Sequence, residues 1–218
     1  MSLPKGISKK TLQQYAGPIF ILNFSFWMVL SWFFYPNYDW TSMSISQLGQ
    51  PDENLIGWIF WSIGLSSTGL LQIPVVSFIK RSLLEVNKKM VRFGTFFLYL
   101  ACLGAVGLGI IPQFSGQVFW ILHIINSTLA FAGLYLGMWC LSIFLLKTDS
   151  NKFKALIPAL FCFGTPIGFI ITQGIRIFLG LPHITPIVIL NFPVWEWMLL
   201  YGIFGAFVSF IYLIPQKN

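Results

Sequence analysis

The longest apolar stretch of the chain runs from Val118 to Leu146 and reads VFWILHIINSTLAFAGLYLGMWCLSIFLL. It contains no Asp, Glu, Lys or Arg. About 20 apolar residues are enough for an α-helix to cross the roughly 30 Å hydrocarbon core of a bilayer. The stretch therefore predicts a membrane-spanning helix, and His123 lies inside it.

Five similar runs surround this stretch and predict a protein built almost wholly within a membrane. The six predicted spans cover approximately residues 16–35, 55–79, 93–111, 118–146, 155–179 and 194–214. The chain of 218 residues is 56% hydrophobic and 9% charged, whereas soluble domains carry about 25% charged residues. Because the linkers are short, residues 1–218 are predicted to form one all-α, polytopic transmembrane domain.

The distribution of basic residues predicts the orientation of the six spans. Every Lys and Arg except Arg176 lies before the first span, between the second and third, between the fourth and fifth, or after the sixth. The positive-inside rule makes that side cytoplasmic and places both termini there. Because topology accounts for the net charge of +7, no nucleic-acid partner is expected, and membrane lipids are the predicted partners.

Two further patterns concern how the spans pack. Most tryptophans, including Trp61, fall near the outer ends of the spans, which is typical of the aromatic belt at a membrane interface. Small residues four positions apart let two helices approach closely. Such pairs occur at Gly133 and Gly137 and at Gly164 and Gly168, and we expect close helix contacts at both.

Polar side chains are concentrated in the first outer loop, from Tyr38 to Phe60, which reads YDWTSMSISQLGQPDENLIGWIF. Both histidines, the one non-cytoplasmic cation and a glutamate lie on the same predicted side of the membrane. We expect these groups to form one site, with the loop as one wall and the fourth to sixth spans as the others. Its predicted members are Asp39, Ser44, Ser46, Asn54, His123, Asn126, Arg176, His183 and Glu196.

His123 carries most weight among these residues. It lies five residues into its predicted span, which is roughly 8 Å below the outer end at about 1.5 Å per residue. Asn126 and Ser127 follow three and four positions later, on the same helix face. A hydrogen bond between helices would explain such a histidine without any chemistry. In a reaction, its near-neutral pKa suits a general acid or base.

The other charged members also have structural alternatives. Ionisable groups inside a membrane usually face a partner or a wet cavity. The fifth and sixth spans are antiparallel neighbours, so Arg176 and Glu196 are expected either to pair with each other or to share the site. Asp39 and His183 lie in loops, where a solvated surface position is the alternative.

Several motifs that define large enzyme classes are absent. The chain has no phosphate-binding glycine loop, no Gly-x-Ser-x-Gly and no His-Glu-x-x-His, and no cofactor is predicted. A proton or ion path usually needs ionisable residues near the middle of the membrane. Here they lie near one surface, which disfavours a transporter.

Three segments, SISQLGQPDENLIGWIFWSIGLSSTGLL, LHIINSTLAFAG and VWEWMLLYG, resemble a six-span family of bacterial and archaeal membrane proteins of unknown function. That family is distantly similar to the eukaryotic autophagy-modulator and GPI-anchor lipid-remodelling factors. The resemblance implies a six-helix fold, the plasma membrane of a prokaryote and, by analogy, a role in handling lipids. The matching positions are Ser46, Gly49, Asn54, His123 and Glu196.

The chain is also similar to membrane hydrolases of the alkaline-ceramidase and adiponectin-receptor type, which place Ser, Asp and His near one membrane face. Those proteins use seven spans and three zinc-binding histidines, whereas this chain has two histidines. A zinc site made by His123, His183 and a carboxylate is an alternative, but no metal site is predicted.

One function that fits the sequence is a membrane enzyme that acts on a lipid at the outer interface. His123 would be the general base, assisted by Glu196 or Asp39, and Ser46 or Ser44 would be the nucleophile. Arg176 would hold a phosphate or carboxylate. The residues expected to bind the substrate are Arg176, Asn54, Ser44, Asn126 and His183.

Functions without catalysis fit the same residues. A lipid-binding or scaffold protein would use the same groove without turnover. A transporter of a lipid or a small solute is the third alternative. The sequence leaves the choice among the three open.

Overall fold

The chain folds into helices in the computed structural model, which describes residues 9–148 and 152–214. Two short 3₁₀ helices, η1 (Ile45–Gly49) and η2 (Val188–Leu190), precede α2 and α6. No strand occurs within the described ranges, so the predicted all-α class is confirmed there. The long helices are α1 (Lys9–Phe33), α2 (Gly57–Leu83), α3 (Lys88–Ile110), α4 (Gln117–Thr148), α5 (Lys152–Phe178) and α6 (Phe192–Leu213).

The helices from α2 to α6 are long and apolar enough to cross a membrane. In α1 the apolar part, Pro18–Phe33, is shorter. The predicted spans and the helices agree closely; the span at 118–146, for example, lies inside α4. Five such helices make this a multi-pass membrane protein. Lys5 and Lys217, which enter the predicted orientation, lie outside the described residues.

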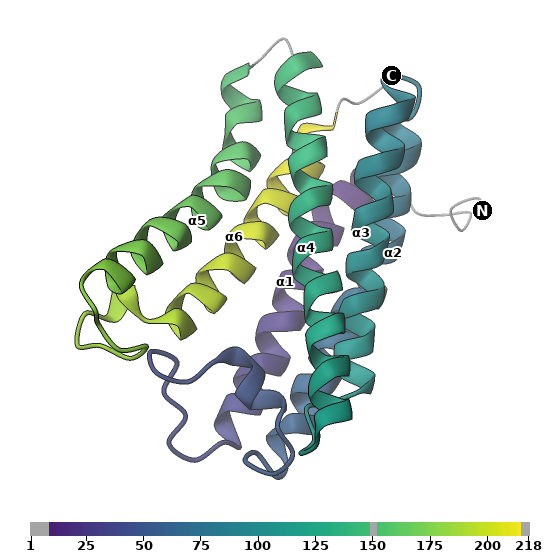
Figure 1. The fold of residues 1–218 in the computed structure, drawn as a ribbon. Helices are drawn as coiled ribbons and strands as arrows, with labels where there is room; N and C mark the ends of the chain where they lie inside the picture. Colours follow the sequence, from purple (N-terminus) through teal and green to yellow (C-terminus); the bar gives the residue numbers. More distant parts are fainter. Residues whose placement is uncertain (1–8, 149–151, 215–218) are drawn as a thin grey trace.

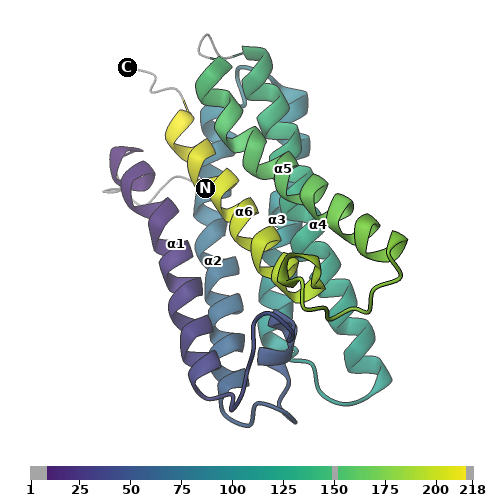
Figure 2. The ribbon, with the colours of Figure 1, turned by 90° about the vertical axis from the view of Figure 1, so that its left-hand side faces the viewer.

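Consecutive helices run in alternating directions (Figure 1). The beginning of α1, the α2–α3 turn and the end of α6 lie at one end of the molecule. The connections 34–56, 111–116 and 179–191 lie at the opposite end, which we call the loop end. In Figure 2, α1 and α2 run side by side, whereas α5 and α6 are inclined to them. Helices α4 and α5 are close together away from the loop end and diverge toward it (Figure 1).

Glycines bring α3 and α4 into close contact. A Cβ atom at Gly133 would lie 2.7 Å from the backbone oxygen of Phe97, and one at Gly137 would lie 2.7 Å from Cγ of Leu98. The predicted close approach at this pair is therefore confirmed. At Gly164 on α5, by contrast, no atom lies within 4 Å of such a Cβ, so the prediction for that position is wrong.

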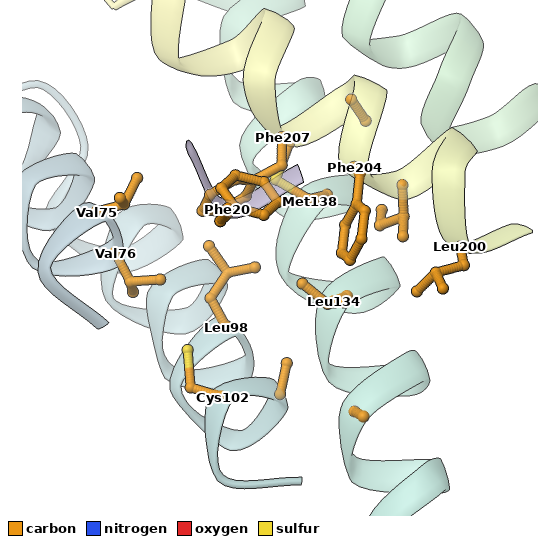
Figure 3. Packing of buried hydrophobic residues seen from close by; sticks show 14 of the residues in the cluster. Phe20, Val75, Val76, Leu98, Cys102, Leu134, Met138, Leu200, Phe204 and Phe207 are labelled. Carbon is orange, nitrogen blue, oxygen red and sulfur yellow. The ribbon is translucent and has the colours of Figure 1, made fainter. Parts of the chain in front are cut away.

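Aromatic rings join α1 to α6 in the core of the bundle. Phe20 packs edge-to-face on Phe204 and Phe207, with ring centroids 5.2 and 5.3 Å apart. Phe24 makes the same contact with Phe204 at 5.3 Å. Figure 3 shows Phe20 and Phe207 beside Met138 of α4, so three helices meet there. Edge-to-face pairs of this kind add about 0.5–1.5 kcal/mol each to the burial of the rings.

Candidate functional site

A cavity of about 460 Å³ lies inside the bundle on the loop-end side of this core. It falls in the range of about 300–1,000 Å³ that is usual for small-molecule sites. Phe24 of α1, Phe204 of α6 and residues of η1, α2, α3, α4 and α5 line it, and most of the walls are apolar or aromatic. Its polar lining residues are Ser46, Thr68, Gln72, His123, Ser127, Tyr135 and Glu196.

The cavity reaches the surface between α4 and α5. Ala132 of α4 lines it and is also exposed, and Pro166 and Phe169 of α5 line it while only half-buried. The two helices diverge toward the loop end (Figure 1). Only 22% of the apolar window of α5 is buried, compared with 56% for α4. Both helices that flank the opening are long and apolar enough to cross a membrane.

His123 projects into this cavity from the second turn of α4. Its side chain is only 9% exposed and stacks on Trp61 of α2, with ring centroids 6.4 Å apart and planes at 20°. Its Nδ1 atom is buried and has no hydrogen-bond partner among the described residues. A buried polar atom without a partner costs about 1–3 kcal/mol, so it requires an explanation. Atoms of this kind also occur away from the cavity, in the side chains of Ser62, Ser142 and Trp197.

Trp61 orients the imidazole and connects it to η1. The sequence places this tryptophan in an interfacial belt, but its side chain is 3% exposed and forms part of the cavity wall. That belt prediction is wrong for Trp61. A Cβ atom at Gly49 would lie 2.5 Å from the indole ring. Glycine at the end of η1 therefore lets the loop rest directly on the tryptophan that stacks on His123.

Glu196 enters the cavity from the opposite helix, α6. Its Oε2 accepts a hydrogen bond of 3.0 Å from the backbone N–H of Ile45 at the start of η1. No other hydrogen bond to this carboxyl group is found within the described part of the chain. One oxygen therefore fixes the loop to α6, and the remaining acceptor positions are free for a ligand.

Ser46 reaches the cavity because local hydrogen bonds fold the segment that carries it. The side-chain oxygen of Gln47 accepts a 2.8 Å hydrogen bond from the backbone N–H of Ser44, which is half of a capping box at the start of η1. The hydroxyl groups of Ser44 and Ser46 lie 2.8 Å apart. Tyr38 donates to the carbonyl groups of Met43 and Ser44, and burial raises the pKa of its phenol.

Asn191, a residue that the sequence reasoning missed, fastens the first loop to the last. It is 2% exposed and precedes α6. Its side-chain amide donates to the carbonyl oxygen of Thr41 at 3.0 Å, and its carbonyl accepts from the N–H of Thr185 at 2.6 Å. An Asn before an apolar run is a helix-capping signal, but its contact with residue 41 is not readable from that signal.

Ser44 and five other predicted site residues do not line the cavity, and three of these five are ionisable. Asp39 is exposed and accepts hydrogen bonds from the N–H of Thr41 at 2.9 Å and the hydroxyl of Ser42 at 2.7 Å. The first and then the second of these bonds lower the pKa of its carboxyl group, which makes it a poor proton-transfer group near neutral pH. His183 is exposed in the last loop. Arg176 is half-buried on α5 and does not line the cavity.

The expected pair of Arg176 and Glu196 does not form, so that alternative is wrong. Arg176 donates to the side-chain oxygen of Gln173 at 2.9 Å and to the backbone oxygen of Leu181 at 3.4 Å. The partner of Glu196 is the N–H of Ile45. Each of the two side chains thus hydrogen-bonds to other residues, and Arg176 does not bring a positive charge to the cavity.

The two predicted asparagines lie at helix contacts and not at the cavity. Asn54 is fully buried and donates to the carbonyl oxygen of Leu48 at 2.9 Å, while its own side-chain oxygen accepts from the N–H of Gly57 at 3.0 Å. Asn126 lies against Gly107 of α3, and its side chain occupies the space that a Cβ atom would need there. Of the face predicted around His123, only Ser127 lines the cavity with it.

The alternative of a zinc site receives no support from the geometry. Among the described residues, no three His, Cys, Asp or Glu side chains come close enough together to hold a metal ion. His123 is buried in the cavity, whereas His183 is exposed in the last loop. The three cysteines, which lie in α3, α4 and α5, are free.

The fold and the cavity define a multi-pass, all-helical membrane protein with a mostly apolar internal site. Residues 17–190 match the family model described as Protein of unknown function (DUF998). Because the match covers most of the chain, the protein belongs to this family. The match includes Ser46 and His123 and ends before Glu196. No curated protein and no solved structure matches the chain.

Proposed function

We propose that this protein binds a membrane lipid in the cavity between α4, α5 and α6, with the head group at the loop end and the apolar chain directed toward the core. The observation that carries this proposal is a mostly apolar cavity of about 460 Å³ whose wall also contains the imidazole of His123 and the carboxyl group of Glu196. The opening between α4 and α5 would let a lipid enter sideways from the bilayer.

The walls of the cavity match the two parts of such a ligand. His123, Glu196 and Ser46 line its polar side. Rings such as Phe24 and Phe204 line the remainder. Each buried CH₂ group of a lipid chain contributes about 0.8 kcal/mol relative to water. A chain that is already dissolved in the bilayer gains much less, so the polar groups would provide most of the selectivity.

Modification of the bound lipid is the second candidate function. It is favoured by the presence of an imidazole, a carboxyl group and a hydroxyl group in one cavity, from His123, Glu196 and Ser46. In that case His123 would act as the general base and Ser46 as the nucleophile. Arg176 and Asp39 have no part in this version, because neither lines the cavity.

We further propose that α1 crosses the membrane with the other five helices and that both termini are cytoplasmic. At about 1.5 Å per residue the 25 residues of α1 extend about 37 Å, which exceeds the roughly 30 Å hydrocarbon core, while its apolar part, Pro18–Phe33, covers the C-terminal portion of that length. The loop end would then face the outside, in keeping with the basic residues at the other end. The plasma membrane of a prokaryote is the proposed location.

The experiment that tests lipid binding narrows the opening of the cavity. The protein and its Ala132→Trp variant are purified from the same membranes in a mild detergent, and bound lipids are identified by native mass spectrometry. We expect the wild type to retain a lipid and the variant to lose it, because the indole would fill the opening. The control is Ile125→Trp, on the same helix but outside the cavity, where the side chain is 50% exposed. Equal lipid content in all three proteins would refute the proposal.

A further inference from the structure

A surface groove of about 500 Å³ lies at the beginning of α3, at the end of the molecule opposite the loop end (Figure 1). We call it the α3 groove, and it is lined by Lys88, Lys89, Arg92, Phe93 and Phe96. Three of these residues carry a positive charge, and no Asp or Glu of the described chain lines the groove. The α3 groove shares no lining residue with the internal cavity, so what binds there is independent of the ligand in the cavity.

The groove follows one face of α3, with charges at its beginning and aromatic rings further along. Arg92, Phe93 and Phe96 follow Lys89 by three, four and seven positions, and residues at these spacings lie on the same side of a helix. The side chains of Phe93 and Phe96 are each 56% exposed, and α3 is long and apolar enough to cross a membrane. A cationic surface thus continues into an apolar one over about two helical turns, roughly 10 Å.

The three positive charges are not neutralised within the described part of the chain. No side-chain hydrogen bond or ion pair involves Lys88, Lys89 or Arg92 there. Lys80 near the end of α2 differs, because its ammonium group lies 5.8 Å from the centre of the Tyr99 ring, within the range of a cation–π contact. The positive-inside rule explains the sign of these charges. It does not require three unpaired cations beside two exposed aromatic rings, and this combination indicates a ligand.

We propose that the α3 groove binds an anionic phospholipid, with its phosphate against Lys88, Lys89 and Arg92 and an acyl chain along Phe93 and Phe96. Ammonium and guanidinium groups form short, charge-assisted hydrogen bonds with phosphate oxygens, and basic pockets at the cytoplasmic side of membrane proteins bind anionic head groups. A soluble phosphate compound would use the cations alone, whereas the exposed rings match a lipid chain. In the proposed topology this lipid belongs to the cytoplasmic leaflet.

The test compares two lipids that share their acyl chains and differ in net charge. The purified protein in a mild detergent is titrated with palmitoyl-oleoyl phosphatidylglycerol, which is anionic, or with palmitoyl-oleoyl phosphatidylcholine, which has no net charge, and bound lipid is measured by native mass spectrometry. We expect phosphatidylglycerol to bind at least about tenfold more tightly, which corresponds to about 1.4 kcal/mol. Equal affinities would overturn the proposal. Displacement of phosphatidylglycerol by an excess of glycerol 3-phosphate would also overturn it, because the site would then take a soluble phosphate.

Two double variants locate the site. Lys89→Gln/Arg92→Gln removes two charges from the groove, and both side chains are exposed, so the fold should be unaffected. Lys80→Gln/Lys147→Gln is the control, because it removes two charges from the same end of the molecule but outside the groove. We expect the first variant to reduce the preference for phosphatidylglycerol at least about fivefold and the control to keep it within about twofold. Equal losses in the two variants, or a preference retained in both, would show that the groove is not the site.

The aromatic rings are tested separately from the charges. Phe93→Ala/Phe96→Ala should weaken the binding of both lipids by a similar factor, at least about threefold, because apolar contact with the chain is lost. The control is Leu103→Ala/Ile110→Ala, whose side chains are 62% and 69% exposed on the same helix outside the groove. Unchanged affinities in the phenylalanine variant would contradict the placement of the chain. Loss of the α3 site while Ala132→Trp still removes a lipid would leave the proposed function intact.

Discussion

Replacing Asn54 with Ala tests whether this buried asparagine holds the loop end together or binds a ligand. Its side chain is fully buried at the point where the end of α1, η1 and the start of α2 meet. The amide donates to the carbonyl oxygens of Leu48 at 2.9 Å and Ser31 at 3.3 Å, and the side-chain oxygen accepts from the N–H of Gly57 at 3.0 Å. The side chain of Asn54 thus provides hydrogen-bond partners for backbone groups in the last turn of α1 and the first turn of α2.

The expected loss of stability follows from the groups that lose their partners. The Gly57 N–H loses a capping interaction, which is worth about 1 kcal/mol. The Ser31 carbonyl loses an amide donor and stays buried, at a cost of about 1–3 kcal/mol. The carbonyl oxygen of Leu48 keeps one hydrogen bond in the variant, because the hydroxyl of Ser31 also donates to it at 3.3 Å. Together these changes predict that Asn54→Ala lowers the free energy of unfolding by about 2–4 kcal/mol.

The assay is a titration with SDS in mixed micelles, followed by circular dichroism, with lipid content measured on the folded fraction. Asn126→Ala is the matched control, because Asn126 is only half-buried and has no hydrogen bond among the described residues; we expect it to cost less than about 1 kcal/mol. If Asn54→Ala leaves the stability unchanged and lowers lipid content instead, Asn54 does not hold the loop end together and is a ligand-binding residue.

Three further predictions concern the cavity and the topology. His123→Gln should change the free energy of unfolding by less than about 1 kcal/mol, because no hydrogen bond to the protein is lost, but it should lower the lipid content. Any turnover should fall about 10²–10⁴-fold. Unchanged lipid content would show that His123 is not part of the site. In a double-mutant cycle, Glu196→Ala and Arg176→Ala should be additive within about 0.5 kcal/mol, and a larger coupling would show that the two side chains interact. Cysteines introduced at Val86 and Gln113 should react with membrane-impermeant reagents from opposite sides of sealed vesicles; reaction of both from one side would contradict the proposed topology.

The helices were predictable because their signal is local and large. A run such as Val118 to Leu146 has no stable place outside a membrane or a core, so its length alone predicts a helix, and α4 extends only a little beyond it. The contacts between loops carry no such signal. Asn191 binds the carbonyl of Thr41, 150 positions earlier in the chain, and neither residue indicates the other in the sequence.

The sequence predicts near which end of the spans the site residues lie. It does not predict toward which neighbouring helix each side chain points. Hydropathy places Ser46, His123 and Glu196 near one end, and the structure brings these three to one cavity. It places Arg176 near the same end, yet this side chain bonds to Gln173 one turn earlier on α5. That spacing of three residues is itself a local signal for such a pair. Trp61 lies near the outer end of its predicted span, and this position predicts a residue of the interfacial aromatic belt. Its side chain is buried instead, because the first loop packs on it.

The division of hydrogen bonds between the first loop and the cavity is the strongest argument that the cavity has a function. The loop uses its polar groups on itself, as Asp39 does with Thr41 and Ser42. In the cavity, the carboxyl group of Glu196 has acceptor capacity left, and no described residue hydrogen-bonds to the imidazole of His123. An unpaired polar group in an apolar environment is costly, and a chain that needed only stability would be served by an apolar residue in place of His123. The proposed ligand would hydrogen-bond to Glu196, which is the physical reason for placing its head group at this end of the cavity.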